Sequence, residues 1–226
     1  PVHHLRGHIA ANYIAFPELE PPFLALCISG GNSMLVDVQD YTEMRIVGAT
    51  RDDAAGECFD KVARVLGLPY PGGRPMEELA RGGDDHAYVL PRSHVADSDL
   101  DMSFSGLKTA VVNLVHNAQQ KGEALDRPGL AASFAAAVSD ELVPRAILAA
   151  ERYGHHTVVA AGGVAANSRI RGDLERACRE HGLRLYLPPL KLCGDNGAMI
   201  GCQAYYEAQC RRYADMSLNA YANLEI

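Results

Sequence analysis

The sequence predicts an α/β fold in which mixed sheets are flanked by helices. Strand-like and helical segments alternate through the second half of the chain, an arrangement typical of layered α/β proteins. Near the start, two apolar runs lie on either side of a turn at residues 29–32, and this pattern predicts a β-hairpin. A hairpin that adds antiparallel strands to such a sheet makes the sheet mixed.

The first part of the chain is predicted to form two helices and three strands. A helix over residues 2–14 ends before Pro17, which cannot continue it. The three strands, each a short apolar run, are predicted at 23–28, 33–38 and 44–47. Apolar side chains on one face predict an amphipathic helix over 53–66, for which Asp52 or Asp53 is a suitable N-cap.

The remainder is predicted to alternate helices with strands. The helices are expected at 77–81, 107–119, 130–153, 165–181 and 195–210, and the strands at 157–161 and 184–187. Pro144 predicts a kink in the helix over 130–153. Gly182 is a suitable C-terminal end for the helix over 165–181. Residues 82–101 are mostly polar, with glycine and proline, and are predicted to be irregular.

Composition and charge narrow the classes of protein. The chain has 226 residues, of which 48% are hydrophobic and 22% charged, as in ordinary globular proteins. Its six cysteines form no CxxC pair and are interpreted as reduced thiols of a cytoplasmic protein. A net charge of −7 gives no support for nucleic-acid binding. No apolar run approaches the roughly 20 residues of a membrane span.

A pair of histidines near the start indicates a metal site. His4 and His8 are four residues apart and therefore share one face of the predicted helix. Asp195 either caps the last helix or completes a site of two imidazoles and one carboxylate. Zinc proteases carry a glutamate after the first histidine, and Leu5 occupies that position here. Two ordinary histidines remain the alternative interpretation.

Two glycine turns and two polar side chains indicate an anion or nucleotide site. Backbone N–H groups at Gly30–Gly31 can approach a phosphate closely, although an ordinary hairpin turn explains the same residues. The turn at residues 162–163 joins a strand to a helix without the GxGxxG fingerprint. Asn167 either caps that helix or contacts a ligand. The carboxylate of Asp60, deeper in the helix over 53–66, is a candidate to accept a hydrogen bond from a ribose hydroxyl or an amine.

The motifs together resemble the TsaD family, long labelled O-sialoglycoprotein endopeptidases. In family order, the matching segments are HHLRGH, ISGGNS, DDAAGECFDKVARVLGLPYPGG, SFSGLKTAV, AAGGVAANSRIR and GDNGAMIG. The resemblance implies a two-lobed, actin-like (ASKHA) fold. It also implies transfer of a threonylcarbamoyl group from threonylcarbamoyl adenylate to N6 of the adenosine beside the anticodon, in tRNAs that read codons starting with A.

The resemblance also implies which residues bind ligands. The metal ligands would be His4, His8 and Asp195, holding one divalent ion per chain, Fe²⁺ or alternatively Zn²⁺. Phosphate and acyl groups would contact Cys27, Ile28, Ser29, Gly30 and Gly31. The nucleoside or threonyl part would contact Asp60, Gly73 and Asn167. The adenylate, or ATP or ADP, would occupy this cleft, and no residue is assigned as a general base.

The family comparison further predicts the organisation of the chain and its partners. Residues 1–22 would be a remnant of the first lobe that carries the metal helix, 23–190 the second lobe with the nucleotide region, and 191–226 a segment returning to the first lobe. The first lobe is expected to be incomplete, because the family's opening hairpin and about one hundred residues are not found, so the chain alone is expected to be inactive. The expected partners are tRNA, TsaB-like and TsaE-like proteins, and a TsaC-like enzyme that supplies the adenylate.

Two departures and four alternatives accompany this interpretation. Asn32 replaces a histidine found in many bacterial members, and Cys27 replaces a tyrosine that joins the metal in some. An O-carbamoyltransferase would need a carbamate-activating domain that is not visible. Actin-like ATPases and sugar kinases need no histidine-bound metal, and Leu5 argues against a metalloprotease. The intact metal triad argues against an inactive scaffold.

Overall fold

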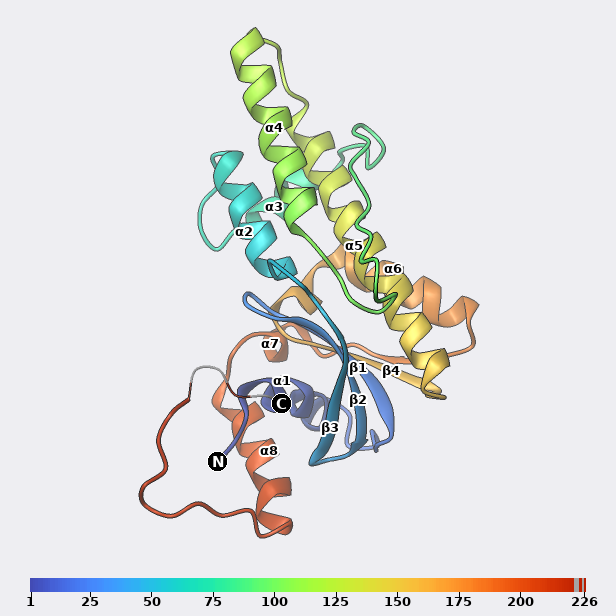
Figure 1. Ribbon diagram of the computed structural model, residues 1–226, viewed down its shortest axis with the longest axis vertical. Coiled ribbons are helices and arrows are strands. Elements are labelled where there is room, and N and C mark those ends of the chain that lie inside the picture. The colour runs from blue at the N-terminus through green and yellow to red at the C-terminus, as the bar shows by residue number, and fades with distance from the viewer. Residues whose placement is uncertain (222–223, 225) are drawn as a thin grey trace.

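A computed structural model describes residues 1–221, 224 and 226 and contains a five-stranded mixed sheet (Figure 1). The strands are β1 (Phe23–Ile28), β2 (Ser33–Asp40), β3 (Glu43–Ala49), β4 (Thr157–Ala161) and β5 (Arg184–Tyr186), in the order β3-β2-β1-β4-β5. β1 is antiparallel to β2 and parallel to β4, which in turn is parallel to β5. The predicted α/β class and mixed sheet are confirmed.

Helices cover both faces of this sheet. One face carries α1 (His4–Ala15) and α8 (Gly197–Gln209). The other carries α2 (Ala55–Val65), α3 (Gly73–Ala80), α4 (Ser105–Lys121), α5 (Arg127–Arg152) and α6 (Ser168–Glu180). Two short helices, η1 (Gly163–Ala166) and α7 (Leu190–Cys193), complete the described elements. The sheet is therefore the middle layer of three.

Strand β1 separates two hydrophobic cores. Its side chains alternate, so that Leu24, Leu26 and Ile28 join the core beneath α2–α6, whereas Phe23 and Cys27 join the core beneath α1. All six residues of β1 are buried, as expected for a strand covered on both faces. Each large side chain buried in this way contributes about 1.5–3 kcal/mol to folding.

The predicted N-cap of α2 is wrong. The cap residue is Ala54, and the hydroxyl of Ser33, at the start of β2, accepts the first helical N–H from Ala55 at 2.9 Å. Asp52 instead accepts the backbone N–H groups of Phe104 (2.8 Å) and Ser105 (3.3 Å) at the start of α4. The acid therefore stabilises a helix distant in sequence, because a side chain from β2 already serves α2.

Other boundaries also differ from the sequence predictions. α3 begins at Gly73, four residues early, with a proline in its first turn, where the missing N–H costs little. α8 begins at Gly197 and is capped by Asn196, whose Oδ1 accepts the N–H of Met199 at 2.9 Å, so the N-cap interpretation of Asp195 is wrong. α5 is continuous through Pro144, and its kink stays a prediction.

A buried polar cluster ties the far end of the sheet together. The carboxylate of Asp37, only 2% exposed, lies 2.8 Å from His155 Nε2 and accepts from Arg45 Nη2 (3.0 Å) and Gln39 Nε2 (2.6 Å). Burial alone would raise the pKa of Asp37, but hydrogen bonds from Gln39, His155 and Arg45 together lower it. The cluster links β2, β3 and the start of β4 through one charged group.

The predicted division into 1–22, 23–190 and 191–226 stays a prediction. In the structure α1 and α8 pack on the same sheet face, and residues 222–223 and 225 lie outside the described residues. Over the described part of the chain, none of the helices is both long enough and apolar enough to cross a bilayer.

Candidate metal and nucleotide site

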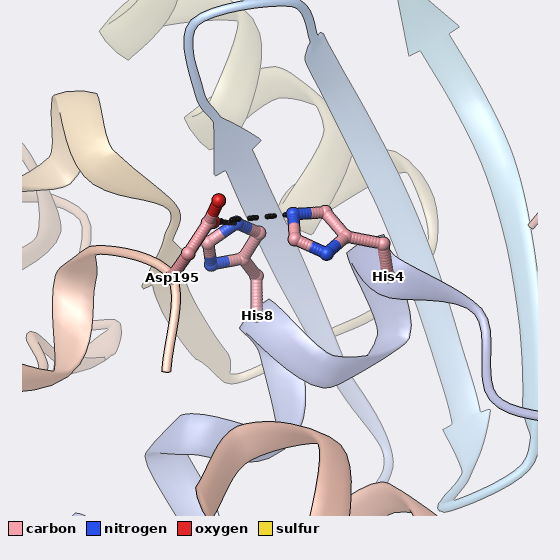
Figure 2. Close-up of side chains that lie close together, drawn as sticks. All are labelled: His4, His8 and Asp195. Atoms are coloured by element: carbon pink, nitrogen blue, oxygen red, sulfur yellow. Dashed lines mark ion pairs between the residues drawn. The ribbon is translucent and has the colours of Figure 1, made fainter. Parts of the chain in front are cut away.

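The described structure brings His4, His8 and Asp195 together (Figure 2). One turn of α1 places the two imidazoles on the same face, and Asp195 reaches them from the connection before α8. Asp195 Oδ1 lies 3.2 Å from His4 Nε2 and 3.1 Å from His8 Nε2. Ligands bound to one zinc-like ion at about 2.0–2.2 Å lie about 3–3.5 Å apart, and both Asp195–histidine distances fall in this range. All three ligand atoms lie within 4.8 Å of one another, so the group is a candidate site for a single metal ion.

The three ligands differ strongly in burial. His8 is 2% exposed, whereas the side chains of His4 and Asp195 are 54% and 77% exposed. Burial lowers the pKa of His8, and the neighbouring His4 lowers it further, while Asp195 opposes both effects. The lowered pKa favours the neutral imidazole, which is the form that binds metals. The group therefore has one buried ligand and two ligands that are open to solvent.

The turn after β1 lies against the start of α2. Ser29 donates its N–H to the carbonyl of Asn32 at 2.8 Å, which closes the turn around Gly30 and Gly31. A Cβ at Gly56 would lie only 2.7 Å from Gly30 Cα, so the helix and the turn are in direct contact. Gly30 and the first turn of α2 therefore form one continuous wall.

Cys27 and Ile28, also predicted to contact ligand, are the last residues of β1. Both are fully buried, and burial raises the pKa of the Cys27 thiol to about 12. Contact with a ligand at these positions would have to use the backbone rather than the side chains. Their predicted role, like that of Ser29 and Gly31, stays a prediction.

Most of the other predicted site residues line one cavity of about 610 Å³. It lies between the turn after β1, α2, α3 and the η1–α6 connection. The predicted residues on its walls are Gly30, Asp60, Gly73 and Asn167, together with Gly163. Sequence reasoning assigned no ligand contact to four larger neighbours: Phe59, Tyr70, Arg74 and Glu77. Glu77 lies one helical turn after Gly73, and this spacing predicts that the two residues share one face of α3.

The polar side chains of this cavity also hold its walls together. Asp60 Oδ1 accepts the N–H of Gly72 at 2.6 Å, which fixes the loop before α3 against α2. Asn167 Oδ1 caps α6 by accepting from Arg169 (3.0 Å) and Ile170 (3.2 Å), so the capping interpretation is confirmed. Their ligand contacts stay predictions.

The turn between β4 and η1 requires glycine at its first position. Gly162 has φ 91°, and a Cβ there would overlap the carbonyl oxygen of Ile28 and lie 2.8 Å from its carbon. The next residue, Gly163, faces the cavity, and a Cβ there meets no described atom within 4 Å. The two adjacent glycines thus have separate reasons to be small.

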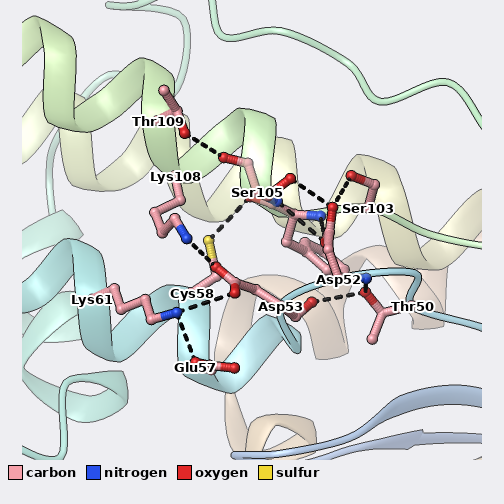
Figure 3. A network of polar contacts seen from close by, with 11 residues as sticks. Thr50, Asp52, Asp53, Glu57, Cys58, Lys61, Ser103, Ser105, Lys108 and Thr109 are labelled. Atoms are coloured by element: carbon pink, nitrogen blue, oxygen red, sulfur yellow. Dashed lines mark hydrogen bonds and ion pairs between the residues drawn. The ribbon is translucent and has the colours of Figure 1, made fainter.

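A network of acids, lysines and serines joins α2 to α4 beside the cavity (Figure 3). Asp53 lies 3.1 Å from Lys61 Nζ and 2.5 Å from Lys108 Nζ, and these hydrogen bonds lower its pKa, the bond from Lys108 most. Lys61 also pairs with Glu57 at 2.7 Å. Lys61 therefore has structural partners, and these explain its place deep in the helix without a ligand.

Comparison with known proteins places these features in a family. The model of the TsaD family, tRNA N6-adenosine threonylcarbamoyltransferase, matches residues 1–202. Curated relatives with that name include proteins from Moorella thermoacetica, 52% identical over 225 residues, and Staphylococcus carnosus, 46% identical over 226. Each alignment covers 100% of this chain but only 66% and 65% of the relative. The chain thus spans about two thirds of the length of these relatives.

Solved structures extend the likeness to the fold. Full-length HypF in its phosphate- and nucleotide-bound form superposes with a TM-score of 0.67 at 14% identity, covering 92% of this chain and 36% of HypF. Component A of (R)-2-hydroxyglutaryl-CoA dehydratase from Acidaminococcus fermentans gives 0.51 at 20%, covering 91% and 69%. Both are actin-like (ASKHA) proteins, so the predicted fold class is confirmed. With the family match over residues 1–202, the chain belongs to the TsaD family.

Proposed function

We propose that the chain carries the transfer site of a tRNA N6-adenosine threonylcarbamoyltransferase. The threonylcarbamoyl group would pass from threonylcarbamoyl adenylate to N6 of the adenosine beside the anticodon, in tRNAs that read codons starting with A. The observation that carries the proposal is the turn at residues 29–32. It contributes Gly30 to the cavity and Asn32 to a second hollow that also contains His4. We infer that an adenylate held in the cavity would extend past this turn toward the metal ligands.

The proposed roles of the site residues differ. Backbone N–H groups at Gly30 and Gly163 would contact phosphate oxygens, since neither position has a side chain to block the approach. Asp60 would accept a hydroxyl or amine of the ligand with the oxygen that does not hold Gly72. His4, His8 and Asp195 would hold one Fe²⁺, with Zn²⁺ as the alternative. When bound, such an ion supplies Lewis acidity toward the acyl oxygen.

Catalysis of this transfer would depend mainly on positioning the two reactants. The N6 amine attacks the carbamoyl carbon, the bond from that carbon to the phosphate oxygen breaks, AMP leaves, and the amine loses a proton to solvent. An anhydride of this kind is a good electrophile, so holding the two reactants in line supplies much of the acceleration. We assign no general base, in keeping with a site built from backbone N–H groups and metal ligands.

The proposal includes partners and place. A TsaC-like enzyme would supply the adenylate, and TsaB-like and TsaE-like proteins would assist the transfer. Because the chain has a net charge of −7, tRNA would dock through a local surface or through those partners rather than through overall charge. The proposed place of the reaction is the cytoplasm, which the free cysteines and the proposed tRNA substrate support.

The test combines metal analysis with reconstitution. The purified chain should bind about one Fe²⁺ under anaerobic conditions, and His4→Ala should abolish binding, whereas His86→Ala, a histidine 90% exposed elsewhere, should not. The transfer assay supplies partners, threonylcarbamoyl adenylate and unmodified tRNA, with the full-length Moorella thermoacetica relative as positive control. Because the chain alone is expected to be inactive, the decisive variant is the counterpart of His4→Ala in that full-length relative. Loss of modified adenosine in this variant supports the proposal, and an unchanged yield contradicts it.

A further inference from the structure

The metal group depends on how two helices dock. His4 and His8 belong to α1, whereas Asp195 precedes α8 by two residues. The Asp195 side chain is 77% exposed, and the ion pairs described for its carboxylate are those with the two imidazoles. Its distance from the histidines is therefore set by the position of α8 on α1 rather than by a rigid pocket of its own.

The two helices meet closely at Gly7. A Cβ at this position would lie 2.8 Å from Ile200 Cδ1 and 3.4 Å from Met199 Cγ, in the first turn of α8. Such a contact sets the distance between the helix axes at one point. Farther along the pair, the ring of Tyr13 on α1 packs edge-on against that of Tyr206 on α8, with centroids 5.4 Å apart. The crossing angle, and with it the place of the carboxylate ligand, therefore depends on attachments beyond Gly7.

Arg6 adds a polar attachment between the two helices. Its Nη1 donates to Glu207 Oε1 (3.2 Å) on α8 and to the carbonyl oxygen of Thr42 (2.8 Å) in the β2–β3 turn. The side chains of Arg6 and Glu207 are only 16% and 10% exposed. Glu207 also accepts from Gln203 Nε2 at 2.9 Å, which holds the carboxylate in place. Ten residues separate Glu207 from the start of α8, about 15 Å along a helix.

We propose that Arg6 is a positioning residue of the metal group. Its described hydrogen bonds go to Thr42 and Glu207 and to none of the three metal ligands. By tying α1 to the far end of α8 and to the sheet, it helps to fix the crossing angle and so to hold Asp195 within reach of both imidazoles. A planar guanidinium suits this role, because it bonds two acceptors in fixed directions. The inference rests on the metal site proposed above.

Arg212 offers a matched control. Its Nη1 donates to the same Thr42 carbonyl (3.2 Å) and to the other carboxylate oxygen of Glu207, Oε2 (3.4 Å), but Arg212 follows the end of α8 instead of lying on α1. Removing it takes away similar hydrogen bonds without releasing α1 from α8. If metal affinity falls in the Arg6 variant but not in the Arg212 variant, the cause is the altered docking of α1 on α8 and not the loss of an arginine as such.

The experiment uses Co²⁺ as the probe. Its affinity is measured by competition with a chelator, and its visible absorption reports the coordination geometry. Arg6→Met should weaken Co²⁺ binding about tenfold, as for other groups that orient metal ligands, and change the absorption bands. Arg212→Met should stay within about twofold of wild type. Thermal unfolding of the metal-free variants checks that all are folded.

The outcomes separate the two proposals. Wild-type affinity and spectrum in a folded Arg6→Met variant overturn the positioning role. If Arg6→Met does not fold, Arg6→Lys keeps the charge without the fork and should lose about threefold; unchanged binding in that variant overturns the role equally. A wild-type protein that binds no Co²⁺ overturns the metal proposal itself, and this inference with it.

Discussion

Replacing Gly162 by alanine should destabilise the fold far more than the same change one residue later. Two effects of a side chain at residue 162 lower the free energy of unfolding. A side chain at φ 91°, ψ 168° occupies a region nearly restricted to glycine, which costs about 1–3 kcal/mol. The new Cβ must also push away the Ile28 backbone at the end of β1, an overpacking that costs about 1–3 kcal/mol. We expect a loss of about 4 kcal/mol for Gly162→Ala.

Gly163→Ala is the matched control. A Cβ there meets no described atom within 4 Å, so the free energy of unfolding should stay within about 0.5 kcal/mol of wild type. Urea unfolding measures both variants, and thermal unfolding should show Gly162→Ala melting roughly 8–16 °C lower. If the two variants unfold at the same urea concentration, the close approach of the β4–η1 turn to β1 is not what selects glycine.

Two further predictions concern buried groups. Because hydrogen bonds lower the pKa of Asp37, its charge stabilises the fold above the ordinary carboxyl pKa of about 4, and this contribution is lost as pH falls through the lowered value. Asp37→Asn should therefore cost about 2 kcal/mol at pH 7 in urea unfolding and approach wild type in acid; a cost independent of pH would contradict the charge's role. Cys27, buried with its pKa raised to about 12, should resist iodoacetamide in the native protein while the exposed Cys210 reacts, as peptide mass mapping can check. Equal labelling rates would refute this.

Local patterns predicted the elements that local forces determine. β1 begins at Phe23 as expected, because an apolar run that follows two prolines has few alternatives. The spacing of His4 and His8 fixed their shared face before any tertiary contact was known. Asp195 was proposed from ligand chemistry and from the family resemblance, and the structure brings it to the pair.

Tertiary contacts account for what was missed. The hydroxyl that caps α2 belongs to Ser33 on β2. The residues around Ala54 contain no pattern that predicts this contact. The cavity walls that include Tyr70 and Glu77 form only in the folded chain, in which Glu77 accepts the N–H of Ser168 at the start of α6 at 3.1 Å. Docking of α1 on α8 likewise joins the two ends of the chain, beyond the reach of any periodicity.

The parallel pairing of β1 with β4 also shapes how the chain is made. Leu24 pairs with Val158, about 130 residues later in the sequence. At roughly 5–20 residues per second of synthesis, β1 would wait on the order of 7–25 s on the ribosome for that partner. Meanwhile β1, β2 and β3 can form a meander whose apolar β1 edge has unpaired backbone groups, the kind of edge that invites pairing with other chains. The sheet that carries the candidate site is thus exposed to aggregation during synthesis, and the yield of folded protein should depend on chaperones that cover this edge.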